Sequence, residues 1–246
     1  MDRLIYTAWS GMRASMVEQR VIASNMANAQ TIGFRAETLT ASPMTLQGPT
    51  LETRVMTENE VHGASLDQGA MIETGNPLDI ALNGDTMMAV QAEDGSEAYT
   101  RRGDLSVDAS GVLSNGDGRP VLGDAGPVTV PLGAKISIGP DGQVLAADPQ
   151  APGAPPQPVG RIKLASTTGS RVAKGLDGLF RVERGGVLPA DDAAQVQVGA
   201  LEQSNVQPTR VLVQMVEAQR LFDLRTKCIA TAREVDQAGT DLMKLS

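Results

Sequence analysis

Apolar residues at the two ends of the chain recur at the spacing of an α-helix. In residues 1–30 they are separated alternately by three and four positions, which places a narrow apolar stripe along one helix face. A second stripe with this spacing follows Pro208 and continues to about Leu242. We predict that both stripes are assembly interfaces, which pair with each other and with neighbouring chains. The interface residues are predicted to be Ile5, Ala8, Met12, Ile22, Met26, Leu212, Met215, Phe222 and Ile229.

The distribution of glycine and proline supports helices at the ends only. All 14 prolines and 24 of the 26 glycines lie between Thr31 and Pro208. Inside a helix, glycine costs about 1 kcal/mol and proline about 3 kcal/mol, so long helices are excluded from the middle of the chain. An alternative for each stripe is packing on the core of its own domain. The narrowness of the stripes and their position at opposite chain ends favour pairing instead.

The middle of the chain has the pattern of short strands separated by turns. Asn-Gly and Asp-Gly pairs, which favour hairpin turns, occur at positions 83–84, 115–116, 117–118 and 141–142. Candidate strands are residues 79–82, 87–91, 98–101, 128–130, 135–138 and 161–164. We therefore expect an α+β fold, with long N- and C-terminal helices forming a coiled-coil-like domain and a central antiparallel β domain.

The same patterns divide the chain into four segments. We expect residues 1–34 to form the N-terminal helix and residues 201–246 the C-terminal helix of a helical domain. Residues 35–75 are polar and have no clear period, so they are expected to be an extended linker. Residues 76–200 are expected to form the β-rich domain.

Composition excludes several classes of function. Lys and Arg total 21 against 29 for Asp and Glu, and a net charge of −8 argues against a nucleic-acid-binding protein. One Cys excludes an intramolecular disulfide framework, and one Cys with one His excludes a zinc site built mainly from those residues. No apolar run approaches the roughly 20 residues needed to cross a bilayer, and the N-terminus has no visible cleaved signal.

Candidate catalytic chemistry is sparse. His62 is expected in a solvated loop, and Cys228 is expected to be a small packed residue of the C-terminal helix. The carboxylates of Asp79 and Asp104 are a candidate pair for a β-rich glycan-binding or glycan-cleaving protein. Six aromatic residues are few for a sugar-binding cleft, which argues against that alternative. We therefore expect no enzyme activity, no cofactor and no metal site.

Five segments of the chain contain motifs that are typical of one protein family. Near the N-terminus, residues 23–35 have the sequence ASNMANAQTIGFR. In the middle, residues 76–85 (NPLDIALNGD) and 99–105 (YTRRGDL) are similar to shared motifs of that family. Towards the C-terminus, residues 199–206 (GALEQSNV) are followed by residues 219–223 (QRLFD). Together these segments resemble the bacterial flagellar rod and hook family, and the resemblance extends over the whole chain, in order.

The resemblance implies a structural axial component of the flagellar basal body. Residues 1–8 resemble the opening of a proximal rod subunit, and a distal rod or hook subunit is the alternative. Expected partners are other proximal rod proteins, the distal rod protein and the flagellar export apparatus, with no nucleic acid and no membrane span. The expected location is the periplasmic rod, reached without a cleaved signal peptide. Residues 86–88 (TMM) stand where the family commonly has a glycine and two aromatics, but their apolar character predicts that the strand is kept.

Overall fold

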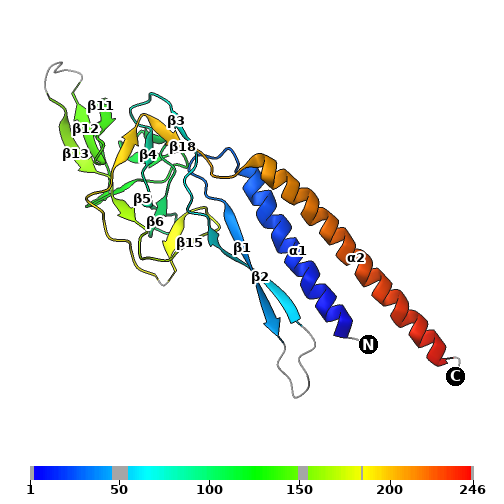
Figure 1. The fold of residues 1–246 in the computed structure, drawn as a ribbon. Helices are drawn as coiled ribbons and strands as arrows, with labels where there is room; N and C mark the ends of the chain where they lie inside the picture. The colour runs from blue at the N-terminus through cyan, green and yellow to red at the C-terminus, as the bar shows by residue number, and fades with distance from the viewer. Residues whose placement is uncertain (1–2, 46–54, 149–154, 184, 245–246) are drawn as a thin grey trace. The chain divides into compact units, whose positions relative to one another are not determined.

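The computed structural model describes residues 3–45, 55–148, 155–183 and 185–244 (Figure 1). Within these ranges the chain forms two α-helices, α1 (Arg3–Ala27) and α2 (Pro208–Lys244). The strands are β1 (Glu37–Thr45), β2 (Val55–Ala64), β3 (Met71–Glu73), β4 (Ile80–Leu82), β5 (Thr86–Gln91), β6 (Glu97–Thr100), β7 (Leu105–Val107), β8 (Leu113–Asn115), β9 (Leu122–Gly123), β10 (Gly126–Pro127), β11 (Lys135–Ile138), β12 (Gln143–Ala147), β13 (Gln157–Arg161), β14 (Leu164–Ser166), β15 (Val172–Lys174), β16 (Phe180–Val182), β17 (Val196–Val198) and β18 (Ala200–Glu202).

These elements form two compact units, each built from separate stretches of the chain. The helical unit contains Met1–Ala27, Glu37–His62 and Gln207–Ser246. The β unit contains Asn28–Ala36 and Gly63–Val206. The expected linker, residues 35–75, contributes to both units and contains β1, β2 and β3. The four-segment division of the chain stays a prediction.

In the helical unit, α1 and α2 lie side by side and antiparallel (Figure 1). Helix α1 ends at Ala27, and a turn follows in which the Thr31 N–H donates to the Asn28 carbonyl at 3.1 Å. Helix α2 begins at Pro208, which is tolerated in a first turn because its missing N–H would have no helical partner there.

The expected fold class, with long terminal helices forming a coiled-coil-like domain, is wrong. Within the described residues the structure has two helices, the shorter one at the N-terminus, and many antiparallel strands. On α2, the expected seam residues Leu212 and Met215 are 48% and 43% exposed, whereas Val211 and Ala218 are buried. One residue turns a helix by about 100°, so the buried face of α2 is rotated away from the face that the spacing predicted.

A two-stranded sheet of β1 and β2 belongs to the same unit as the helices. Asn25, near the end of α1, joins this sheet through both ends of its side-chain amide. Its Nδ2 donates to the Glu37 carbonyl at 3.0 Å, and its Oδ1 accepts from the Glu37 N–H at 2.8 Å. Because the amide forms hydrogen bonds with both the carbonyl and the N–H of Glu37, it fixes the start of β1 against α1.

The β unit contains one five-stranded sheet, in the order β14-β5-β6-β16-β15, and a three-stranded sheet, β11-β12-β13. Four two-stranded pairs complete the unit: β4 with β17, β3 with β18, β7 with β8, and β9 with β10. Every pairing is antiparallel. The many short strands follow from the dense glycine-containing turns, of which Gly84, Gly118 and Gly142 have positive φ.

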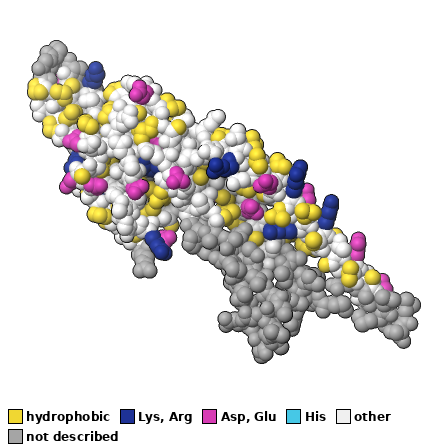
Figure 2. All heavy atoms as spheres, in the orientation of Figure 1, with side chains coloured by type: hydrophobic (Ala, Val, Ile, Leu, Met, Phe, Trp, Pro, Cys, Tyr) yellow, Lys and Arg dark blue, Asp and Glu magenta, His cyan; other side chains and the backbone are white. Residues whose placement is uncertain are grey.

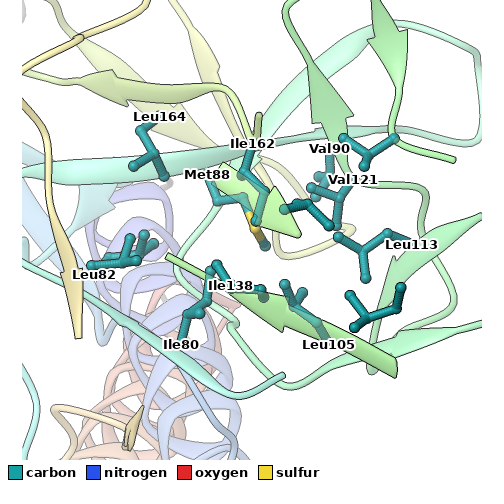
Figure 3. Close-up of a cluster of buried hydrophobic side chains, with 14 of the residues drawn as sticks. Ile80, Leu82, Met88, Val90, Leu105, Leu113, Val121, Ile138, Ile162 and Leu164 are labelled. Carbon is teal, nitrogen blue, oxygen red and sulfur yellow. The ribbon is translucent and has the colours of Figure 1, made fainter. Parts of the chain in front are cut away.

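Strand β5 is buried on both faces and separates two hydrophobic clusters. Met88 and Val90 point into the larger cluster, whose side chains converge in Figure 3. Met87 and Ala89 point into the smaller one, with Tyr99 and other residues. The prediction that residues 86–88 keep a strand is therefore confirmed.

Two of the expected strands differ from the structure by more than one residue at an end. Residues 128–130 form only an isolated bridge between Val112 and Thr129, although Val128 and Val130 are buried. Residues 161–164 contain the end of β13 and the start of β14. Residues 128–130 are held by backbone hydrogen bonds to residues 111, 113 and 121, and residues 161–164 pass from the three-stranded to the five-stranded sheet. A period of two in apolar residues does not distinguish such segments from a regular strand.

Gly103 allows the backbones of two segments to touch, so it provides a test of the β unit. The Ile80 N–H donates to the Gly103 carbonyl at 2.9 Å, and a Cβ on Gly103 would lie 1.8 Å from the Ile80 carbonyl oxygen. We expect Gly103→Ala to lower the free energy of unfolding by about 3 kcal/mol, the upper end of overpacking costs. Urea unfolding followed by circular dichroism measures it. Gly160→Ala, whose Cβ would make an ordinary 3.4 Å contact with Val128, is the control. Equal midpoints for the two variants would contradict the close approach.

Candidate functional site

Glu202, in β18, carries a buried carboxylate that joins three segments of the β unit. Its side chain is 1% exposed. Oε1 accepts from Arg35 Nη2 at 2.8 Å and from the Gly69 N–H at 2.8 Å. Oε2 accepts from Arg101 Nε at 2.7 Å and Nη2 at 2.6 Å. A buried carboxylate is tolerated only when it is paired and hydrogen-bonded, so these segments are held to Glu202.

Arg101 extends this cluster to the turn between β4 and β5. Its Nη1 donates to the carbonyls of Gly84 at 2.7 Å and Thr86 at 2.6 Å, and its Nη2 donates to the Leu82 carbonyl at 2.5 Å. With the bonds to Glu202, the guanidinium uses its full set of donors. The planar fork of arginine suits this role, because lysine has no fixed geometry for several acceptors.

Arg35 is the less well satisfied of the two arginines. Its Nε and Nη1 have no hydrogen-bond partner among the described residues. Burial lowers the pKa of Arg35 from its usual value, and repulsion from Arg101 lowers it further, against the opposing effect of Glu202. The cluster therefore contains two cations around one anion, and Glu202 is the member on which both depend.

Backbone and amide hydrogen bonds fasten the segment after α1 to the segment before α2. The Gly33 N–H donates to the Glu202 carbonyl at 2.8 Å. Asn205 donates from its N–H to the Phe34 carbonyl at 3.2 Å, and its Oδ1 accepts from the Ala36 N–H at 2.7 Å. Residues 33–36 and 202–205, far apart in sequence, are thus held together inside the β unit.

The Glu202 cluster, which consists of Glu202, Arg35 and Arg101, brings three of the sequence motifs into contact. It unites Arg35, Arg101 and Glu202 with the turn that follows β4, so each residue comes from a different motif. Sequence reasoning noted these motifs but assigned no role to the charged residues. The available signal was the presence of charge inside segments rich in apolar and small residues, which favours a buried ion pair.

A groove of about 490 Å³ lies between α1 and α2 within the helical unit. Most of its lining is apolar, with amide and carboxylate groups among it. The residues that line it are Gln19, Ile22, Ala23, Met215, Ala218, Gln219, Phe222 and Asp223. Three of the predicted interface residues, Ile22, Met215 and Phe222, are therefore brought together in one concave surface.

The other predicted interface residues lie elsewhere on the helices. Met12, Met26 and Ile229 are half-buried, and Leu212 is exposed outside the groove. The side chains of Ile5 and Ala8 lie outside the described part of the chain. Their role as assembly residues stays a prediction.

Arg225 is a contact residue between the helices that the sequence pattern missed. Its Nη1 donates to the Gly11 carbonyl and to the Ser15 Oγ of α1. The apolar spacing indicated Phe222 and Ile229 and no residue between them. A charged side chain gives no signal in an apolar period, so only the packed helices reveal this contact.

The other candidate residues do not form a reactive cluster in the described structure. Asp79 and Asp104 face each other in an isolated bridge outside the strands, but Asp79 accepts from Thr74 Oγ1 at 2.6 Å and Asp104 pairs with Arg102 at 2.8 Å. Cys228 is exposed, contrary to the expectation that it is packed.

His62 lies in β2 and not in a loop, and its side chain is outside the described part. Within that part of the chain, no group of three or more His, Cys, Asp or Glu side chains is placed to hold a metal ion. The described helices also include none that is long and apolar enough to cross a membrane.

Comparison with family models defines the class of protein. Residues 5–35 match the model described as flagella basal body rod protein. Residues 81–146 match the flagellar hook protein FlgE/F/G D1 domain, and residues 197–242 match the flagellar basal body rod FlgEFG protein C-terminal model. The three matches cover most of both helices and part of the β unit, and they define a structural protein of the flagellar rod and hook class.

Individual relatives narrow this class. The chain is 40% identical to the flagellar basal-body rod protein FlgF of Escherichia coli (strain K12), with all of both chains covered. It is 33% identical to FlgF of Caulobacter vibrioides, with 98% of each chain covered. It is 31% identical to the rod protein FlgG of Bacillus subtilis, with 99% of this chain and 100% of the relative covered. The chain belongs to the FlgF family of flagellar basal-body rod proteins, which are part of the basal body.

The Glu202 cluster makes an asymmetric prediction about stability. Glu202→Gln leaves two buried cations without their anion, so we expect it to lower the free energy of unfolding by about 3–5 kcal/mol. Arg35→Met should cost less, because it removes a cation with two unpaired donors and leaves Glu202 paired with Arg101. Urea unfolding of both variants measures the difference, with the exposed Glu183→Gln as control. A larger loss for Arg35→Met than for Glu202→Gln would show that the cluster depends on Arg35.

Proposed function

We propose that the chain is an axial subunit of the proximal rod, which assembles helically through its helical unit and transmits torque. The observation that carries this proposal is the groove between α1 and α2. It contains Ile22, Met215 and Phe222, and Met215 remains 43% exposed. An apolar groove that the subunit leaves open is suited to side chains from a neighbouring helix.

The helices also carry apolar side chains outside the groove, which a neighbouring subunit would bury. Figure 2 shows hydrophobic side chains among charged ones along the described surface of the helices. The large exposed apolar residues of the helices are Trp9, Met16, Leu212, Val213, Met215, Val216, Leu221, Leu224 and Val235. Exposed apolar surface on this scale is typical of a protein–protein interface, and its burial contributes about 25 cal/mol per Å² before ordering costs.

The expected occupants of the groove are the outward-facing apolar side chains of helices from adjacent rod subunits. Such a contact is heterologous, because the groove and the exposed side chains are different surfaces. Heterologous contacts whose rotation does not close build a helical assembly, as a rod requires. The partners in this proposal are the other proximal rod proteins and the distal rod protein.

The proposal also includes the position of the subunit in the rod and the route by which it is exported. The 40% identity to FlgF of Escherichia coli over the full length of both chains supports the proximal position that the resemblance of residues 1–8 implies, over a distal rod or hook role. We also propose passage through the flagellar export apparatus without a cleaved signal peptide, and a role without catalysis. The separate hydrogen-bond networks of Asp79 and Asp104 support the last point.

Met215→Asp tests the assembly surface with little effect on the subunit fold. A carboxylate in the groove would be buried without a partner when a neighbouring helix docks. We expect incorporation into basal bodies to fall by about tenfold or more, as for a loss of about 1.4 kcal/mol or more per contact. Incorporation is measured by immunoblotting of purified basal bodies, together with swimming in soft agar.

Thr231→Asp, an exposed position of the same helix outside the groove, is the matched control. Circular dichroism should give the same helix content for both variants. Normal incorporation and swimming of the Met215→Asp variant would refute the groove as an assembly surface.

A further inference from the structure

The tip of the β15–β16 hairpin presents a leucine that no other part of the described chain covers. Residues 175–178 form the turn, and Leu176 is fully exposed. Turns of this kind favour Gly, Asp, Asn, Ser and Pro, and the turn contains two glycines and Asp177. The turn therefore forms without any need for a large apolar side chain at position 176.

The tip is held rigid by hydrogen bonds and ion pairs. The Gly175 N–H donates to the Leu179 carbonyl at 2.7 Å, and the Asp177 carboxylate accepts from the Leu179 N–H at 3.2 Å. Arg181 pairs with the same carboxylate at 2.7 Å, and Arg119 donates to the Asp177 carbonyl at 3.2 Å. The hydrogen bonds from Arg181 are the main reason that the pKa of Asp177 is lowered to about 2.

The base of the hairpin is also fixed. Lys174 Nζ donates to the Arg35 carbonyl at 2.9 Å and lies 3.4 Å from the centre of the Phe34 ring. A leucine on a hairpin fixed at both ends loses little conformational freedom on binding. Preorganised apolar side chains of this kind make effective interface anchors.

The β unit also contains an open recess of about 430 Å³. The groups at its polar side satisfy one another, because Lys163 pairs with Glu97 at 2.6 Å and Tyr99 Oη donates to Glu97 at 2.7 Å. The remainder of the wall is largely apolar, and Val187 on it is 61% exposed. The recess is lined by Glu97, Leu122, Gly123, Asp124, Gly126, Lys163, Val187, Leu188, Pro189 and Ala190.

We propose that Leu176 of one subunit inserts into this recess on a second copy of the chain. The inference rests on the proposed function, since it requires several copies in one rod. The Leu176 tip and the recess are separate surfaces of the same unit, so the contact between them is heterologous. Repeated along the rod, it adds a contact between β units to the contact between helices.

Charge also favours a second copy as the occupant. In direct contact at the tip are two guanidinium groups and one carboxylate, those of Arg119, Arg181 and Asp177. Asp94 acts on Arg181 through space and balances one of these cations, and Lys174, which flanks the turn, leaves an excess of one positive charge at this end of the hairpin. The recess has two carboxylates and one ammonium, those of Glu97, Asp124 and Lys163. The hairpin tip therefore has an excess of positive charge and the recess an excess of negative charge, which orients Leu176 towards the recess.

Cysteine cross-linking in assembled rods tests this contact. Cys228 is the only cysteine, so a Cys228→Ser background is free of thiols. In that background, Leu176→Cys is combined with Ala190→Cys, and cells are oxidised with copper phenanthroline before basal bodies are purified. We expect a ladder of covalent multimers of the chain. Leu132→Cys with Ala190→Cys, which moves the thiol to another exposed leucine of the same unit, should give no ladder.

The substitution Leu176→Asp provides the second measurement. We expect about tenfold fewer copies of this variant in basal bodies than of Leu132→Asp. If the double-cysteine chain is present in basal bodies without a ladder, or cross-links only to another protein, the contact with a second copy is refuted and the proposed function stands. If the chain is absent from basal bodies, the proposed function fails, and the inference fails with it.

Discussion

The buried carboxylate of Glu202 is the interaction on which the β unit depends. It neutralises Arg101, whose remaining donors hold the turn between β4 and β5, and it pairs with Arg35 in the segment that follows α1. Removing a charged group from water is costly, so both buried guanidinium groups depend on the carboxylate of Glu202. The ion cluster thereby makes the positions of four distant segments interdependent. The two segments that lead to the helices are part of it, so the β unit brings together the points from which both helices extend.

The two units differ in how completely they bury their apolar side chains. In the β unit, β5 is buried on both faces, and two clusters enclose most of the large apolar side chains (Figure 3). On α2, apolar side chains surround the helix, so α1 covers only one part of them. Val211 and Ala218 are buried, whereas Val213, Val216 and Leu224 remain exposed. This difference agrees with a rod protein in which the β unit folds by itself and the helices are completed by neighbours.

The sequence predicted local structure correctly where one residue type, such as glycine or proline, determines the backbone conformation. Gly and Pro excluded long helices from the middle of the chain, and the turn glycines at positions 84, 118 and 142 adopt positive φ. Periodicity was less reliable. It did not single out Val211, which is buried on α2, and it missed Arg225 because an arginine carries no apolar signal. It also marked residues 128–130 as a strand, although Thr129, between the buried residues Val128 and Val130, forms only an isolated bridge.

By itself, the sequence determined the positions of the helices and turns and the family, because backbone preferences and motifs are properties of consecutive residues. Only the tertiary structure decided which face of α2 meets α1, that β1 and β2 belong with the helices, and that Arg35, Arg101 and Glu202 share one site. The reason is physical: a helix with apolar residues on several faces has several possible packings, and a buried charge reveals its partner only when distant segments are brought within a few ångströms.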